Sequence, residues 1–109
     1  MLETFDAPLT CTRVRFTSDE LTSLCPLTGQ PDFNTVEIEY VPTERCIESK
    51  SLKLYLWSFR DTQIFVEQLA AKIAGDVQRA VEAHRVRVTV TQHTRGGIVT
   101  EATAEIPAI

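Results

Sequence analysis

Cys25 and Asp32 are the two side chains of this sequence whose types and spacing could support covalent chemistry. A thiolate is a strong nucleophile, and a nearby carboxyl group could serve as an acid or a base. The loop between them contains two prolines and Gly29, which would let the chain fold back and bring the two groups together. A half-buried cysteine and an ordinary turn aspartate would show the same spacing, so the pattern alone leaves both interpretations open.

A second group of polar residues lies at the predicted start of a helix, where the sequence reads ESKSLKLY. Glu48 and Ser49 suit the cap and first turn of that helix. Lys50, Lys53 and Trp57 share a face that points away from the predicted core, which places two ammonium groups and an aromatic ring on one exposed strip. Such a strip could bind phosphate, although composition by itself favours an ordinary solvated face.

Other candidate residues also have plain structural explanations. Arg95 precedes two glycines and could place a cation beside bare backbone amides, but a hairpin turn with a surface arginine fits equally well. Glu67 reads as a surface carboxylate early in a predicted helix. His84 and His93 have no partners at metal-ligand spacing, so no metal is expected. The glycine patterns of dinucleotide-binding folds and P-loops do not occur.

The elements that must position these residues follow from hydrophobic periodicity. Alternating residues predict strands over 12–16, 34–41, 85–93 and 98–106, and a threonine and a glutamate at capping-box spacing predict a short helical turn over 17–24. A helical period begins at Ser49, and a second helical stretch runs to about Ala83. This order predicts an α+β domain with two helices on one face of a four-stranded antiparallel sheet.

Size and charge narrow the functional classes. The chain has 109 residues and a net charge of −4, so we expect a single domain over 1–109 with no basic surface for nucleic acid or anionic lipid. No apolar segment reaches the length of a membrane span. The amino terminus lacks a signal-peptide pattern, and three cysteines suggest free thiols in the cytoplasm. A pocket in so small a chain must be shallow or shared between subunits.

The runs LCPLTGQPDF at residues 24–33 and ESKSLKLY at residues 48–55 resemble the 7-cyano-7-deazaguanine reductases, the QueF-type nitrile reductases of the tunnelling fold. The resemblance extends from about Phe16 to Ile98. It implies β-β-α-α-β-β units that assemble into pentameric rings, paired as a decamer, with active sites between neighbouring subunits. The reaction it implies is the NADPH-dependent reduction of the nitrile of 7-cyano-7-deazaguanine to an aminomethyl group, in the queuosine pathway of tRNA modification.

The same resemblance implies a role for each candidate residue. Cys25 matches the nucleophile that forms a covalent thioimide, and Asp32 matches the general acid. The remaining matches contact the substrate or the cofactor: Glu67, Glu48 and Ser49 at the base, and Lys50, Lys53 and Arg95 at the NADPH phosphates. Cys11 and Cys46 match no functional position.

The chain departs from the family pattern at Val66, where QueF-type enzymes carry a histidine. A histidine can relay protons and a valine cannot, so the later protonation steps lack that group. Two alternative functions remain at this stage. One is a QueF-like amidinotransferase, in which ammonia attacks the thioimide while the base sits in tRNA, and the net charge of −4 argues against it. The other is a non-redox, base-binding ring subunit.

Overall fold

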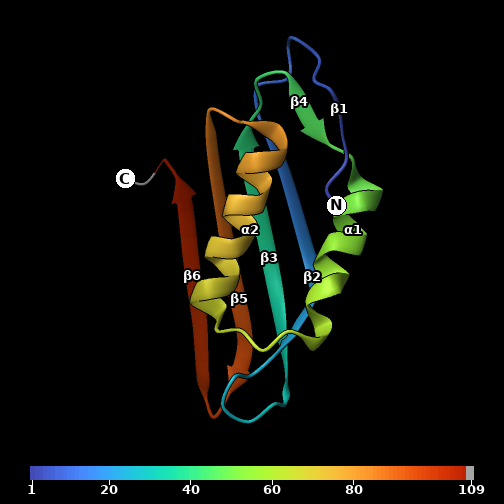
Figure 1. Ribbon diagram of the computed structural model, residues 1–109. Coiled ribbons are helices and arrows are strands. Elements are labelled where there is room, and N and C mark those ends of the chain that lie inside the picture. Colours follow the sequence, from blue (N-terminus) through green and yellow to red (C-terminus); the bar gives the residue numbers. More distant parts are fainter. Residues whose placement is uncertain (108–109) are drawn as a thin grey trace.

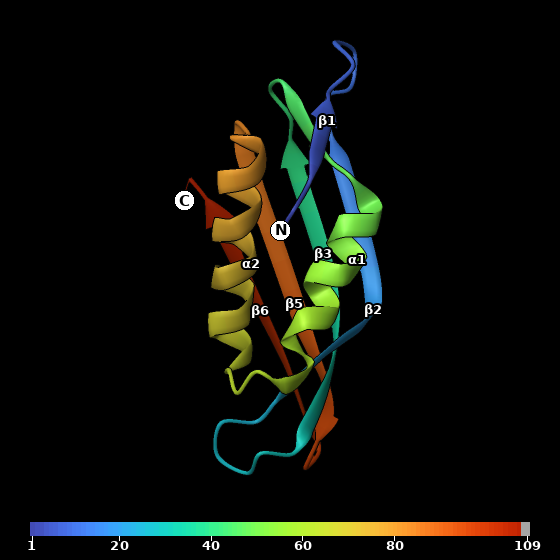
Figure 2. The same cartoon turned by 45° about the vertical axis from the view of Figure 1, so that its right-hand side comes forward.

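The computed structural model describes residues 1–107, in which two helices cover one face of a four-stranded antiparallel sheet (Figure 1). A view turned by 45° shows both helices in the same layer (Figure 2). The strand order of the sheet is β2-β3-β5-β6, with β2 at Val14–Leu24, β3 at Pro31–Val41, β5 at Arg85–Arg95 and β6 at Ile98–Ile106. Between the two strand pairs lie α1 (Ser49–Trp57), the 3-10 turn η1 (Ser58–Asp61) and α2 (Val66–Val81).

The central strands β3 and β5 form because their apolar residues alternate and pair across the sheet. Every second residue faces the helices, and the apolar residues at these positions are at most 1% exposed. The inward positions sit directly opposite one another in the register, with Val36 opposite Val90, Ile38 opposite Val88 and Tyr40 opposite Val86. This confirms the predicted α+β arrangement and its strand alternation.

The helical turn predicted between residues 17 and 24 is wrong, because this segment belongs to the eleven-residue strand β2. Its pairing with β3 is interrupted by a bulge between Ser18 and Leu21, after which the register resumes to the end of the strand. The threonine and glutamate at capping-box spacing therefore lie in an extended segment. Pairing along a long neighbouring strand outweighs a local four-residue helix signal, because a single helical turn has no cooperative support.

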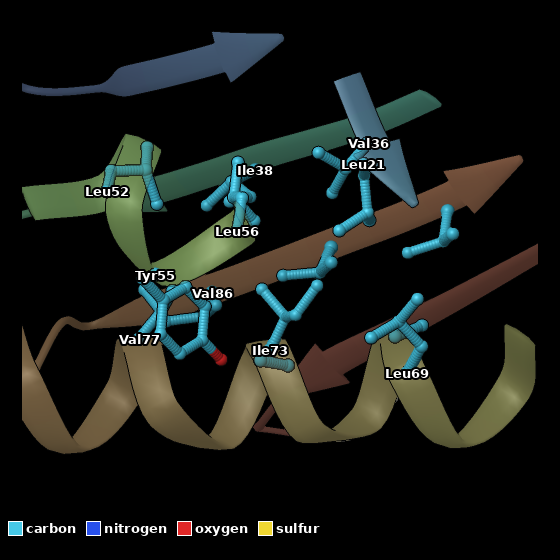
Figure 3. Packing of buried hydrophobic residues seen from close by; sticks show 14 of the residues in the cluster. Leu21, Val36, Ile38, Leu52, Tyr55, Leu56, Leu69, Ile73, Val77 and Val86 are labelled. Atoms are coloured by element: carbon cyan, nitrogen blue, oxygen red, sulfur yellow. The ribbon is translucent and has the colours of Figure 1, made fainter. Parts of the chain in front are cut away.

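The two helices bury one apolar stripe each against the sheet. In α2 the buried row is Leu69, Ile73, Val77 and Val81, each at most 1% exposed, whereas Phe65 precedes the helix and is exposed. In Figure 3, Leu69, Ile73 and Val77 rise from α2 toward the sheet while Leu52 and Leu56 approach it from α1. None of the helices within residues 1–107 combines the length and the apolar character needed to cross a bilayer.

A second, two-stranded sheet is an unpredicted feature. β1 (Thr4–Asp6) pairs antiparallel with β4 (Arg45–Ile47), and the sequence patterns predicted no strand in either segment. Strands of three residues are too short to show a period in the sequence. The pairing is reinforced by Arg45, which donates to the Thr4 side chain at 3.0 Å, and it leads directly into α1.

Candidate active site

The end of β2 is tied to the segment that leads into α2. The Leu24 amide donates to the Thr62 carbonyl at 2.8 Å, and the Ile64 amide donates back to the Leu24 carbonyl at 3.1 Å. Cys25 therefore follows a strand that lies alongside the entry to α2, and it does not follow a helical turn as the sequence had suggested. This contact explains how a thiol at residue 25 comes close to the first turn of a helix forty residues later.

The loop after Cys25 reverses the chain within a few residues. The Cys25 amide donates to the Gln30 carbonyl, and the Gly29 amide donates to the Cys25 carbonyl, both at 2.8 Å. Gly29 has φ of +71°, a conformation that most residues with a side chain avoid. The reversal sets β3 antiparallel to β2 and places Asp32 directly opposite Ser23. The fold-back predicted from the prolines and the glycine is thus present, although the structure forms it between two strands.

A pocket of about 210 Å³ collects the residues predicted to carry the chemistry. Its lining comes from the loop after β2, the start of β3, the first turn of α2 and the strands β5 and β6. The loop after β2 and the start of α2 lie toward the same end of the sheet (Figures 1 and 2). The lining residues of the pocket are Cys25, Pro26, Asp32, Phe65, Val66, Glu67, Gln92 and Thr100. The nucleophile, acid and carboxylate candidates therefore line one pocket within one chain, although each comes from a different element.

Gln92 and Thr100 are pocket residues that the sequence interpretation missed. They are direct partners in the β5–β6 ladder, and Gln92 also pairs with Asn34 of β3. On each strand the inward-facing apolar positions end at Val36, Val90 or Ala102. The next inward-facing residue along that strand is polar: Asn34, Gln92 or Thr100. A polar residue that keeps the inward phase of a strand is the signal that could have identified them.

The surroundings of Cys25 favour its reactive form. Hydrogen bonds from the Thr28 side chain, and then from the Thr28 and Leu27 amides, lower the pKa of the Cys25 thiol, while partial desolvation and the charge of Asp32 act in the opposite direction. The thiol is only partly buried, so a small molecule can reach it. By contrast, Cys46 is buried, and this burial raises the pKa of its thiol.

Asp32 is a buried carboxylate with a specific cation partner. Its side chain is 8% exposed and accepts a hydrogen bond at Oδ1 from Nη1 of Arg95. A buried carboxylate needs such a partner because the loss of hydration is costly. Beneath it, the Asn34 amide donates to the Ser23 hydroxyl at 3.2 Å, and both of these side chains are almost fully buried. Asp32 is therefore held in a fixed position at the pocket.

Glu67 lies in the first turn of α2 and is exposed at the pocket. Within residues 1–107 no hydrogen bond or ion pair engages its carboxylate, so both oxygens are free to accept N–H groups of a ligand. The neighbouring Val66 is 8% exposed and gives the pocket an apolar wall. The arrangement offers a nucleophilic thiol, a carboxylate that can exchange a proton, and a second carboxylate that can bind a polar heterocycle.

The predicted residues of α1 lie away from this pocket. Glu48 is the N-cap of α1: its carboxylate accepts from the amides of Lys50 and Ser51, each at 2.8 Å, and these bonds lower its pKa. Ser49, Lys50 and Lys53 are exposed. α1 begins near β4, whereas the loop after β2 lies at the opposite end of the molecule (Figures 1 and 2). The structure does not bring these four residues to Cys25 within one chain.

A larger hollow of about 810 Å³ separates α1 from β2 and contains none of the three pocket candidates. Ser49, Lys53 and Trp57 line it from the helix, and the bulged part of β2 lines the other side. Arg60 stacks over the Trp57 ring at 3.3 Å from its centre. Two of the three residues in the predicted exposed strip, Lys53 and Trp57, therefore border this second hollow.

Similarity to known proteins covers most of the chain. A sequence model of the family described as "QueF-like protein" matches residues 31–108. An NADPH-dependent 7-cyano-7-deazaguanine reductase of Alkalilimnicola ehrlichii is 54% identical over 79% of this chain and 67% of its own length. The reductase of the same name from Halorhodospira halophila is 45% identical over 95% of this chain and 90% of its own length.

Solved structures agree with the sequence matches. The apo crystal structure of an archaeosine synthase described as QueF-Like superposes with a TM-score of 0.85 and 28% identity, covering 94% of this chain and 98% of that one. The resemblance that the sequence motifs suggested, together with its fold, is confirmed by these matches. The chain belongs to the QueF-like protein family.

Proposed function

We propose that this protein is an NADPH-dependent 7-cyano-7-deazaguanine reductase, an oxidoreductase that converts the nitrile of this base to an aminomethyl group. The observation that carries the proposal is the pocket shared by Cys25, Asp32 and Glu67. The relatives that are 43–54% identical and bear the name of this reductase support the same activity and the same cofactor.

The first step that these residues support is covalent capture of the nitrile. Sulfur of Cys25 bonds to the nitrile carbon, one π bond of the nitrile opens, and the nitrogen takes up a proton to give a thioimide. Asp32, which lines the same pocket as Cys25, passes the proton lost by the thiol on to that nitrogen. Glu67 holds the base through its N–H groups, with the plane of the ring against Val66. Two molecules of NADPH would each supply one hydride to the former nitrile carbon. The C–S bond would break with return of the Cys25 thiolate, and protons taken up at nitrogen would complete the amine.

The binding of NADPH is supported by the charge on α1. Within residues 1–107, neither the Lys50 nor the Lys53 ammonium group has a carboxylate partner, and Lys53 borders the 810 Å³ hollow. Two unpaired ammonium groups suit the phosphates of a dinucleotide, since the chain lacks a glycine-rich phosphate loop. We assign Lys50 and Lys53 to the cofactor. We assign Glu48 and Ser49, at the start of the same helix, to the substrate base.

These assignments require sites that are shared between subunits. The cofactor lysines and the Cys25 pocket lie on different parts of one chain, and a pocket of about 210 Å³ is smaller than most ligand sites. We therefore propose that the chain acts as one domain, residues 1–109, of a homo-oligomeric ring of pentameric type, paired as a decamer. Its single hydrophobic core, built from both helices and the main sheet, supports the domain assignment. The free cysteines of the chain support the proposal that it works in the reducing cytoplasm.

The decisive experiment is mass spectrometry of the protein incubated with the cyano base in the absence of NADPH. Wild type should gain one covalently bound base per chain, and Cys25→Ala should gain none. Cys11→Ala is a matched control, because Cys11 is also a partly exposed free thiol, and it should react like wild type. Adding NADPH should then release the aminomethyl base with consumption of two equivalents of cofactor. No adduct on folded wild-type protein would refute the proposal.

Subunit sharing has its own test. The Cys25→Ala variant should be inactive, and the Lys50→Met/Lys53→Met double variant should show little turnover at an NADPH concentration near the wild-type KM. At that concentration, mixing the two variants under conditions that exchange subunits should restore activity. Restoration occurs only if one chain supplies the thiol and its neighbour supplies the lysines. Absence of restoration in verified mixed oligomers would contradict a shared site.

The structural match to an archaeosine synthase keeps the amidinotransferase as a second candidate. In that reaction ammonia, and not a hydride, would attack the thioimide. The higher identity to reductases and the net charge of −4 favour the reductase. Ammonia with the captured base should therefore give no amidine, and salt-sensitive binding to tRNA should be absent. Amidine formation without NADPH consumption would favour the amidinotransferase over the reductase.

A further inference from the structure

Arg95 makes a set of contacts that its expected cofactor role does not explain. It is the last residue of β5, directly before the β5–β6 hairpin, and its guanidinium reaches back to the start of β3. Nη1 donates to Oδ1 of Asp32 and to the Pro31 carbonyl, the latter at 2.9 Å, and Nη2 donates to Oε1 of Gln30 at 2.9 Å. One side chain thus binds three consecutive residues of the segment that joins Cys25 to Asp32.

We propose that Arg95 is a positioning residue, which orients Asp32 and closes the Cys25–Asp32 loop for attack on the nitrile. This inference rests on the proposed reductase function, and it changes the assignment of Arg95 from the cofactor to the first chemical step. The contacts span more than sixty residues of sequence, so the hairpin holds the loop from outside it.

The other arginines of the sheet do not show this pattern. Arg85, at the opposite end of β5, makes a single ion pair with Glu105 at 3.2 Å, and that guanidinium is about half exposed. The carboxylate that Arg95 binds is far more buried than Glu105, since Asp32 is 8% exposed and Glu105 is 21% exposed. A guanidinium has rigid, planar donors, so three acceptors in one segment fix the orientation of that segment.

The consequence for catalysis concerns the two oxygens of Asp32. Arg95 occupies Oδ1, and within residues 1–107 no hydrogen bond engages Oδ2, which leaves Oδ2 to exchange a proton with the thiol and the nitrile nitrogen. The guanidinium also offsets the charge of Asp32, and that charge raises the pKa of Cys25. Without Arg95, the carboxylate would be free to rotate and would face the thiolate unshielded.

The adduct reaction separates this role from cofactor binding, because capture of the nitrile needs no NADPH. We would measure the rate of covalent base attachment to Cys25 in Arg95→Met and Arg95→Lys, with Arg85→Met as the control on the same strand. Arg95→Met should slow attachment about a hundredfold, as expected when a reacting group loses its orientation. Arg95→Lys keeps the charge but not the three-way contact, and it should slow attachment about tenfold. Arg85→Met should react like wild type.

A second measurement excludes a general structural effect. In a Cys25→Ala background, Arg95→Met should bind the cyano base with an unchanged Kd, since Glu67 and the pocket wall remain. If Arg95→Met unfolds, Arg95→Lys alone decides the question. Wild-type adduct rates in the Arg95 variants, with only a raised KM for NADPH, would overturn the inference and restore the cofactor role. A parallel loss of base affinity would also overturn it, whereas a wild type without any adduct would overturn the proposed function as well.

Discussion

Leu69→Ala should strongly destabilise the fold, because Leu69 lies in the part of α2 that holds the pocket against the sheet. Its side chain is 0% exposed and projects toward the sheet, two residues after Glu67 (Figure 3). The substitution removes three buried carbons, worth about 0.8 kcal/mol each, and the cavity left behind adds about 1 kcal/mol. We expect a loss of about 3.5 kcal/mol from a total stability of about 5–15 kcal/mol.

Urea unfolding followed by far-ultraviolet circular dichroism measures this loss. With an m value of about 1.5 kcal/mol per molar, the midpoint should fall by about 2 M while m stays constant. Protein concentration must be equal in all samples, since subunit association contributes to apparent stability.

Leu54→Ala is the matched control for this prediction. It is the same chemical change on the other helix, at a side chain that is 61% exposed. Its cost should lie within about 0.5 kcal/mol of zero. Buried leucines usually lose more than about 2 kcal/mol of unfolding free energy on substitution by alanine. A loss below about 1 kcal/mol for Leu69→Ala would therefore refute the claim that the buried row of α2 stabilises the core. Equal costs for the two variants would refute the burial argument.

Three further predictions concern the thiol, acid stability and the cofactor. Thr28→Val should raise the pKa of Cys25, so that alkylation of the thiol by iodoacetamide requires a higher pH. Thr28→Ser keeps the hydroxyl group and should leave this pH dependence unchanged. Identical pH profiles of alkylation for wild type and Thr28→Val would contradict the prediction. Burial opposes ionisation of Asp76, but hydrogen bonds hold its pKa below the ordinary value, so its stabilisation is complete above about pH 4 and is lost on further acidification. Asp76→Asn should therefore weaken the fall of the unfolding free energy below that pH, and an unchanged slope would exclude the effect. Lys50→Met with Lys53→Met should raise the KM for NADPH without slowing adduct formation, and a slower adduct would place these lysines at the base.

The regular elements could be predicted where the sequence repeats a pattern over several turns or residue pairs. The alternation in β3 and β5 and the four-residue row in α2 follow from residue periods alone, because burial of one face selects the period. The capping-box pattern at Thr17 led to a wrong prediction of a helical turn, because this pattern involves only four residues. Pairing with β3 decides that segment, and this pairing is invisible in a local window.

The candidate site also contains some residues that the sequence could identify and others that it could not. Cys25 and Asp32 could be selected from their types and the loop between them, and the family resemblance supplied Glu67. Gln92 and Thr100 could not be selected, because polar residues in strands are ordinary until the register places them at a pocket.

The sequence by itself determined the α+β class, the order of the two helices and the four strands of the main sheet, and the presence of a thiol and a carboxyl group on one reversing loop. These properties depend on local periods and on turn residues such as Gly29, whose effects act over a few positions. The tertiary structure alone decided that the loop meets the first turn of α2 and that Arg95 binds Asp32 from the far hairpin. Such contacts join residues more than thirty positions apart, and only the register of the strands and the packing of the helices bring them together.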